Sequence, residues 1–208
     1  MSLIASDKGN FSPVPAGNHP AICYQVVDFG VQRGGKFPAP KHQIRINWEI
    51  PSERIVINGE DLPRAIGRTF TLSLNAKANL GKALESWRGK PFTAEERVAF
   101  DVKRLLGAAA MVNVVHVQSN GKTYANVSSI SPLPKMLQSS IGKPENPMVY
   151  WEIEQIAETG TITDKIPEWM RDVIKQSDEW KAFVGDHIDE SGPAPREAVS
   201  SDESEVPF

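Results

Sequence analysis

Basic and aromatic residues are interspersed along the first 135 residues in a pattern that suits a negatively charged, aromatic ligand. The basic residues on or near the expected strands and loops are Arg33, Lys36, Lys41, Arg45, Arg68, Lys77 and Lys122. The aromatic residues among them are Tyr24, Phe29, Phe37, Trp48, Phe70 and Tyr124. Cationic side chains neutralise phosphates, and flat rings stack on unpaired bases. The mixture favours binding to a single-stranded nucleic acid, although any basic barrel would contain some of it.

The aromatic residues are expected to serve different purposes. Phe37 is the best stacking candidate, because it lies in the basic loop 33–38, where it has no strand core to fill. Trp48 lies on the apolar face of an expected strand, which favours burial. Phe70 and Tyr124 are retained as candidate contacts to nucleic acid.

The common catalytic and metal-binding motifs are missing from the sequence. The four histidines are far apart, and none has the spacing HxxxH or HExxH. There is also no GxxxxGK[ST] loop, no GxSxG turn and no GxGxxG turn after a strand. Cys23, the single cysteine, lies in an apolar run and is expected to be buried. We therefore predict a protein that is not an enzyme and needs no metal or other cofactor.

Charge is distributed unevenly along the chain. Residues 1–135 contain 17 Lys and Arg against 10 Asp and Glu, whereas residues 136–208 contain 6 against 16. This asymmetry predicts a basic nucleic-acid-binding domain over 1–135, a linker with two short helices over 136–185, and a disordered acidic tail over 186–208. No apolar run reaches the length of a membrane span and no signal peptide is recognisable, so we expect a cytoplasmic protein.

Alternation of apolar and polar residues predicts five strands in the basic domain. They are expected at Pro20–Gly30, His42–Ile50, Arg68–Leu74, Ala110–Gln118 and Thr123–Ile130. Pro51 is expected to end the second strand. The dipeptides Asn58-Gly59 and Asn120-Gly121 predict hairpin turns.

The period changes to that of a helix between the third and fourth strands. Leu80, Leu84 and Trp87 share one face of an expected helix, and Thr93 with Glu96 forms the pattern of a capped start for another that leads into 100–106. The predicted fold is therefore mainly β, with three strands, a helical insert and two further strands. This is the layout of an OB-fold, a five-stranded antiparallel barrel that binds oligonucleotides. Another small antiparallel α+β domain stays open as an alternative.

The last seven residues are the most specific feature of the sequence. Three acids, Asp202, Glu203 and Glu205, precede the apolar end Val206-Pro207-Phe208. A phenylalanine beside a carboxylate can enter a small apolar pocket rimmed by Arg or Lys, and the acids add long-range attraction. The alternative is a solubilising tail. We also expect helices over 148–157 and from Pro167 onward.

These features resemble the single-stranded-DNA-binding proteins of bacteria and their phages, whose tails end in acids followed by an apolar residue, Pro and Phe. The body is more similar to a phage-encoded group, through the segments 16–19, 27–32 and 84–93. The resemblance implies an OB-type barrel, a role in DNA replication or recombination, and a tail tip that docks onto replication and recombination proteins.

We therefore expect the chain to bind single-stranded DNA without strong sequence preference in a bacterial host cell, and to recruit partners through its tail. Two alternatives remain: a protein-protein adaptor, or a non-catalytic accessory subunit of a recombination nuclease. Whether the protein forms a homo-oligomer is left open.

Overall fold

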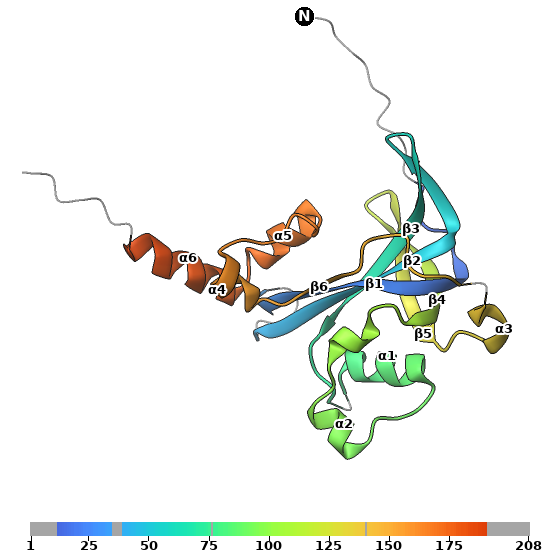
Figure 1. The fold of residues 1–208 in the computed structure, drawn as a ribbon, viewed down its shortest axis with the longest axis horizontal. Helices are drawn as coiled ribbons and strands as arrows, with labels where there is room; N and C mark the ends of the chain where they lie inside the picture. Colours follow the sequence, from blue (N-terminus) through green and yellow to red (C-terminus); the bar gives the residue numbers. More distant parts are fainter. Residues whose placement is uncertain (1–11, 35–38, 76, 140, 191–208) are drawn as a thin grey trace, which may run out of the picture.

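Five long antiparallel strands form a sheet that curls into an open half-barrel (Figure 1). The computed structural model describes residues 12–34, 39–75, 77–139 and 141–190. The strands lie in the order β3-β2-β1-β4-β5, so β3 and β5 are the two edges of the opening. Their bounds are β1 (Gly17–Gln32), β2 (Lys41–Ile57), β3 (Glu60–Thr71), β4 (Ala109–Ser119) and β5 (Lys122–Ser131). The predicted mainly-β class is confirmed.

Both predicted hairpin turns are present. Asn58 and Gly59 connect β2 to β3, and Asn120 and Gly121 connect β4 to β5. The φ angles are 53° and 86° in the first turn and 50° and 72° in the second. Two consecutive positive φ angles match the twist of antiparallel strands, and Asn-Gly adopts them at little cost.

Pro51 does not end the second strand, contrary to our prediction. β2 continues to Ile57, and its register against β3 shifts between Ile50 and Arg54. The shift leaves residues 51–53 without ladder partners on β3, so the missing N–H of Pro51 interrupts no hydrogen bond there. β2 and β3 therefore extend as a long two-stranded arm.

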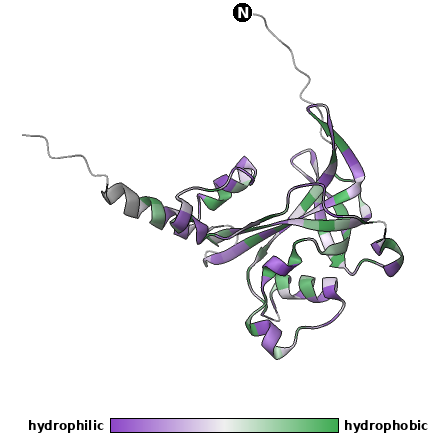
Figure 2. Ribbon diagram, viewed as in Figure 1, coloured by the Kyte–Doolittle hydropathy of each residue, from purple (hydrophilic) through white to green (hydrophobic). Residues whose placement is uncertain are grey.

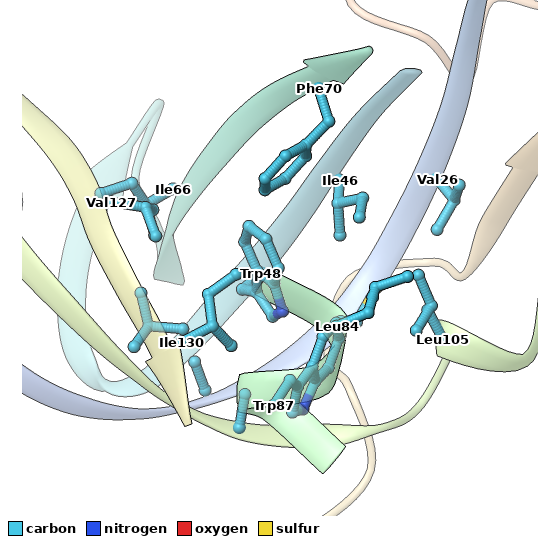
Figure 3. Packing of buried hydrophobic residues seen from close by; sticks show 14 of the residues in the cluster. Val26, Ile46, Trp48, Ile66, Phe70, Leu84, Trp87, Leu105, Val127 and Ile130 are labelled. Carbon is cyan, nitrogen blue, oxygen red and sulfur yellow. The ribbon is translucent and has the colours of Figure 1, made fainter. Parts of the chain in front are cut away.

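The inner face of the sheet carries the main hydrophobic core. Trp48, fully buried on β2, contacts Trp87 of the helix α1 (Asn79–Arg88) with 5.6 Å between ring centroids. Figure 3 shows Trp48 in the midst of side chains from β2, β3, β5 and α1. Figure 2 shows hydrophobic residues gathered where α1 meets the strands. The predicted burial of Trp48 and Cys23 is confirmed.

Three short helical elements lie between β3 and β4 in the chain. After α1 come α2 (Ala94–Val98) and a 3-10 turn, η1 (Val102–Leu105). Thr93 and Glu96 form the predicted capping box at the start of α2. The expected continuation of that helix through 100–106 is wrong, because α2 ends at Val98 and only the single turn η1 follows.

The C-terminal part of the described chain packs on the outer face of β1. The short strand β6 (Val149–Trp151) pairs parallel with β1, where a helix had been expected over 148–157. It is followed by α4 (Gln155–Thr159), α5 (Glu168–Ile174) and α6 (Asp178–Glu190), while α3 (Lys135–Gln138) precedes it. The region predicted as a linker thus carries a packed cluster. Its buried members are Val27, Phe29, Val149, Trp151, Ile153, Ile156, Ile166, Met170 and Ile174.

Polar contacts reinforce this packing. Glu49 on β2 is fully buried, and its carboxylate accepts hydrogen bonds from the backbone N–H of Glu145 (2.8 Å) and the backbone N–H of Asn146 (2.9 Å). The side-chain amide of Asn146 donates a third, of 2.8 Å. Ser177, also buried, accepts from the N–H of Trp180 and separates α5 from α6. Among the described residues, no helix combines the length and apolarity needed to cross a membrane.

We predict that Trp48→Ala lowers the free energy of unfolding by about 3–5 kcal/mol, because it empties a large fully buried site. Trp48→Phe should cost clearly less, since it keeps an aromatic ring and removes a buried N–H that has no hydrogen-bond partner among the described residues. Urea denaturation measures both. Equal losses in the two variants would contradict the packing described here.

Candidate nucleic-acid interface

Two adjoining grooves follow the edge strand β3. The first, with a volume of about 560 Å³, is lined by residues 62–67 of β3, and the second, of about 680 Å³, by residues 68–71. The two sets of residues are consecutive on β3, and Arg45 of the first groove donates a 3.3 Å hydrogen bond to Thr69 of the second, so the grooves adjoin. We call them together the β3 track. At about 3.3 Å per strand residue, ten residues extend the track over roughly 30 Å.

The β3 track is basic. Its cationic side chains are Arg45 and Arg64 in the first groove, and Lys41, Arg68 and Lys77 in the second. None of the described residues that line either groove is Asp or Glu. The remaining polar lining of the second groove consists mainly of amides and hydroxyls, which can hydrogen-bond to a ligand without adding charge. The track is therefore suited to an anionic chain.

The three arginines of the track donate their hydrogen bonds to neutral acceptors among the described residues. Arg45 Nε donates to Asn47 Oδ1 (2.9 Å), and Arg45 Nη1 donates to Thr69 Oγ1 (3.3 Å). Arg64 Nη1 donates to the Ser12 carbonyl (2.5 Å), and its Nε to the Arg54 carbonyl (3.2 Å). These contacts orient the guanidinium groups but do not neutralise them.

Four arginines outside the track are paired with acids. Arg33 Nε contacts both carboxylate oxygens of Asp178, at 2.8 and 2.9 Å. Arg54 is bound by Asp61 and by Glu145. Arg88 likewise pairs with Glu96, and Arg97 pairs with Glu85. Carboxylates compensate these four charges, whereas the described lining of the β3 track contains no carboxylate.

Arg68 also connects the two open edges of the half-barrel. It projects from β3, and its Nη1 donates to the carbonyls of Val127 (3.3 Å) and Ser128 (3.2 Å) on β5. No ladder pairs β3 with β5 among the described residues. The guanidinium also lies 5.1 Å from the ring centroid of Phe70. The side chain of Arg68 thus connects the edges β3 and β5 and contributes a positive charge to the second groove.

Gly67 allows the side chains of Arg45 and Asn47 to lie across β3. A Cβ atom at position 67 would be 1.8 Å from Asn47 Oδ1 and 2.8 Å from a terminal nitrogen of Arg45. Asn47 is itself held by a 2.7 Å hydrogen bond to Gln25 Oε1. Burial lowers the pKa of Arg45, which stays high enough for the group to be charged at neutral pH.

The structure brings together five of the predicted nucleic-acid contacts: Lys41, Arg45, Arg68, Phe70 and Lys77 all line the β3 track. Arg33 does not join them and pairs with Asp178 of α6 instead. Lys36 and Phe37 lie outside the described residues, as do Asp202, Glu203, Glu205, Val206, Pro207 and Phe208 of the tail.

Phe70 lines the second groove but is largely buried. Its side chain is only 3% exposed and belongs to the inner core, so its ring offers little surface for stacking on a base. On β3 the inward positions alternate with outward ones, and Phe70 pairs with the buried Ile44 of β2. The alternation of the sequence alone did not distinguish the inward face of this strand from the outward one.

The remaining two predicted contacts, Lys122 and Tyr124, lie on the β4–β5 hairpin. Tyr124 is 47% exposed and sits opposite Val117, which is also exposed. Lys122 is exposed next to the turn. This hairpin belongs to the edge of the opening that faces β3, so it is a separate candidate contact surface beside the track.

Two residues of the first groove were missed by the sequence analysis. Arg64 falls in the part of β3 for which no strand was predicted. Trp169 lies on α5, in the region interpreted as a linker, and is 50% exposed. The sequence contained a signal for it: Met170, Val173 and Ile174 form the apolar stripe of α5, and Trp169 lies outside that stripe.

A separate cleft of about 270 Å³ collects several titratable groups, among them Asp28, His42 and Tyr150. His42 Nε2 lies 2.6 Å from Asp28 Oδ1, and this hydrogen bond raises the pKa of His42. Burial and the hydrogen bond to Glu152 raise the pKa of Tyr150. Among the described residues, no three acidic, His or Cys side chains are grouped so that they could hold a metal ion.

Comparison with known proteins adds no assignment. No protein-family model matches the chain, and no curated protein matches it either. The β3 track, with its basic lining, is therefore the observation from which function is argued.

The Asp28–His42 contact predicts a pH dependence of stability. The pKa of His42 is raised in the folded protein, so its contribution is fully present below its unfolded pKa of about 6.5 and is lost as the pH rises through the higher folded pKa. Urea denaturation near pH 6 and near pH 8.5 should therefore show a larger stability difference between wild type and His42→Gln at the lower pH. A difference that grows with pH would contradict this sign.

Proposed function

We propose that the protein binds single-stranded DNA along the β3 track, without strong sequence preference. The observation that carries this proposal is the row of five basic side chains along grooves whose described lining contains no carboxylate. A backbone with one negative charge per nucleotide gains most from such a row, because each neutralised phosphate releases counterions.

The geometry favours a single strand over a duplex. The track follows one strand edge, and its length of roughly 30 Å corresponds to a few nucleotides, within the range of about 4–16 that one OB-fold binds. Amides and hydroxyls in the second groove can hydrogen-bond to any base. Rings beside the track could stack only on bases that are unpaired.

We further propose that the half-barrel is of the OB type. In support, β1 pairs with both β2 and β4, β1 to β3 form a meander, and β4 and β5 form a hairpin. In OB-folds the face of the second and third strands binds oligonucleotides, together with the loops beside it. Here the outward residues of β2 and β3 supply part of the track.

The proposed biological role is that of a phage-encoded single-stranded-DNA-binding protein acting in replication or recombination. The segments on which this resemblance depends are placed mainly in the framework: 27–32 in β1, and 84–93 across the end of α1 and the residues after it. They support a shared fold rather than a shared set of DNA contacts.

We also propose that the acidic stretch 202–208 recruits partner proteins of replication and recombination. This proposal depends on the sequence pattern of acids before Val206-Pro207-Phe208, which lies outside the described residues. A positively rimmed apolar pocket on the partner would receive the phenylalanine ring.

The first prediction of this proposal concerns salt. With five cations on phosphates, the logarithm of the affinity for oligo-dT should fall with the logarithm of salt concentration at a slope of about −3.5. Duplex DNA of equal length should bind more weakly. Fluorescence anisotropy at several salt concentrations measures the affinity for each DNA and its dependence on salt. An affinity for oligo-dT that does not change with salt concentration would contradict phosphate neutralisation along the track and would favour the adaptor or accessory-subunit alternatives.

Lys77→Ala should weaken oligo-dT binding and reduce the magnitude of the salt slope by about 0.7, the share of one contact. Lys90→Ala is the matched control, because Lys90 is an exposed lysine that lines neither groove. The same loss in both variants would show that only net charge matters and that the track is not the binding site.

Deletion of residues 202–208 should leave the affinity for oligo-dT unchanged or slightly raise it, most clearly at low salt, because it removes three acids that are covalently linked to a basic domain. It should abolish co-purification of replication and recombination proteins, and Phe208→Ala should reproduce that loss alone. A truncated protein that loses DNA binding and keeps its partners would place the tail in the DNA site.

A further inference from the structure

Trp169 lines the first groove and is half-exposed. It lies in the first turn of α5, whose residues Met170 and Ile174 are buried against the outer face of the sheet. The indole contributes little to that packing, since half of its surface remains in solvent. A half-exposed tryptophan that lines a groove is available to contact a ligand, whereas a core residue is not.

The indole of Trp169 lies over Arg45, a cation of the β3 track. The guanidinium carbon of Arg45 lies 4.8 Å from the Trp169 ring centroid, which is a cation–π contact. Arg45 is fixed in turn by Asn47 and Thr69, and Asn47 by Gln25. A chain of hydrogen bonds across β1, β2 and β3 therefore holds the support on which the ring rests.

We propose that Trp169 is a base-stacking platform for single-stranded DNA, so that α5 forms one wall of the binding groove. This inference rests on the proposed function and adds to it a subsite for an unpaired base. One part of the ring is covered by Arg45, and the exposed part is open to a base. Arg45 and Arg64, in the same groove, are placed to meet the phosphates that flank that base.

The groove favours a nucleotide over an apolar protein segment. Two guanidinium groups that no described carboxylate neutralises stand beside the ring, and burying them under an apolar partner would be costly. In a nucleotide, the base can stack on the indole while its flanking phosphates pair with the two guanidinium groups. Stacking on tryptophan also tolerates every base, which agrees with binding that is not sequence-specific.

The test compares wild type, Trp169→Ala and Trp169→Phe on two ligands of equal length: oligo-dT and an oligonucleotide of abasic deoxyribose phosphates. Wild type should prefer oligo-dT. Trp169→Ala should lower the affinity for oligo-dT about 5- to 100-fold while changing abasic binding little, and Trp169→Phe should restore most of the preference. A merely structural role would reduce the affinity for both ligands alike.

Tryptophan fluorescence provides a second measurement that does not depend on the alanine variant folding. Oligo-dT should quench wild type more than Trp169→Phe, whereas Trp180→Phe, which alters a half-buried tryptophan of α6, should be quenched like wild type. If wild type binds oligo-dT with the expected salt dependence but Trp169→Ala keeps the full preference over the abasic strand, this inference is overturned and the proposed function stands. If wild type does not bind oligo-dT, both fail.

Discussion

Strand β1 is buried on both faces, and the other parts of the protein are arranged around that constraint. Its inner face belongs to the core with Trp48, while its outer residues Val27 and Phe29 belong to the cluster formed with β6, α4 and α5. A register shift between Cys23 and Gln25 helps a single strand to serve both clusters. Because β1 hydrogen-bonds to β2 on one side and β4 on the other, its position determines that β3 and β5 remain as open edges.

The open edges connect the fold to the proposed site. β3 has no ladder partner on its outer side among the described residues, and Arg68 bridges its gap to β5 through two carbonyls. The packing on the outer face of β1 also brings α5 next to β2, so Trp169 reaches Arg45. The β3 track therefore combines residues from the barrel and from the C-terminal region. Outside the track, arginines such as Arg33 and Arg54 are neutralised by acids that lie largely in the same C-terminal region.

Local signals predicted much of the framework and little of the site. Alternation identified β2 and the burial of Trp48, and Asn-Gly identified both hairpin turns, because these depend on neighbouring residues. The pairing of β6 with β1 joins residues more than 120 positions apart, which no local period reveals. Likewise, the continuation of β2 past Pro51 depends on the register shift against β3, which no local signal reveals. Trp169 was missed because its placement depends on contact with Arg45, and the burial of Phe70 was not predicted because alternation does not show which face is inward.

The most direct test of the account is photo-cross-linking of the full chain to an oligonucleotide in which iodouracil replaces thymine, followed by mass spectrometry of the cross-linked peptides. The account predicts cross-links in residues 62–71 of β3 and at the start of α5, 167–170, with the aromatic Trp169 as the main acceptor. Cross-links confined to α1 and α2, or to the cleft around Asp28 and His42, would contradict a DNA path along β3.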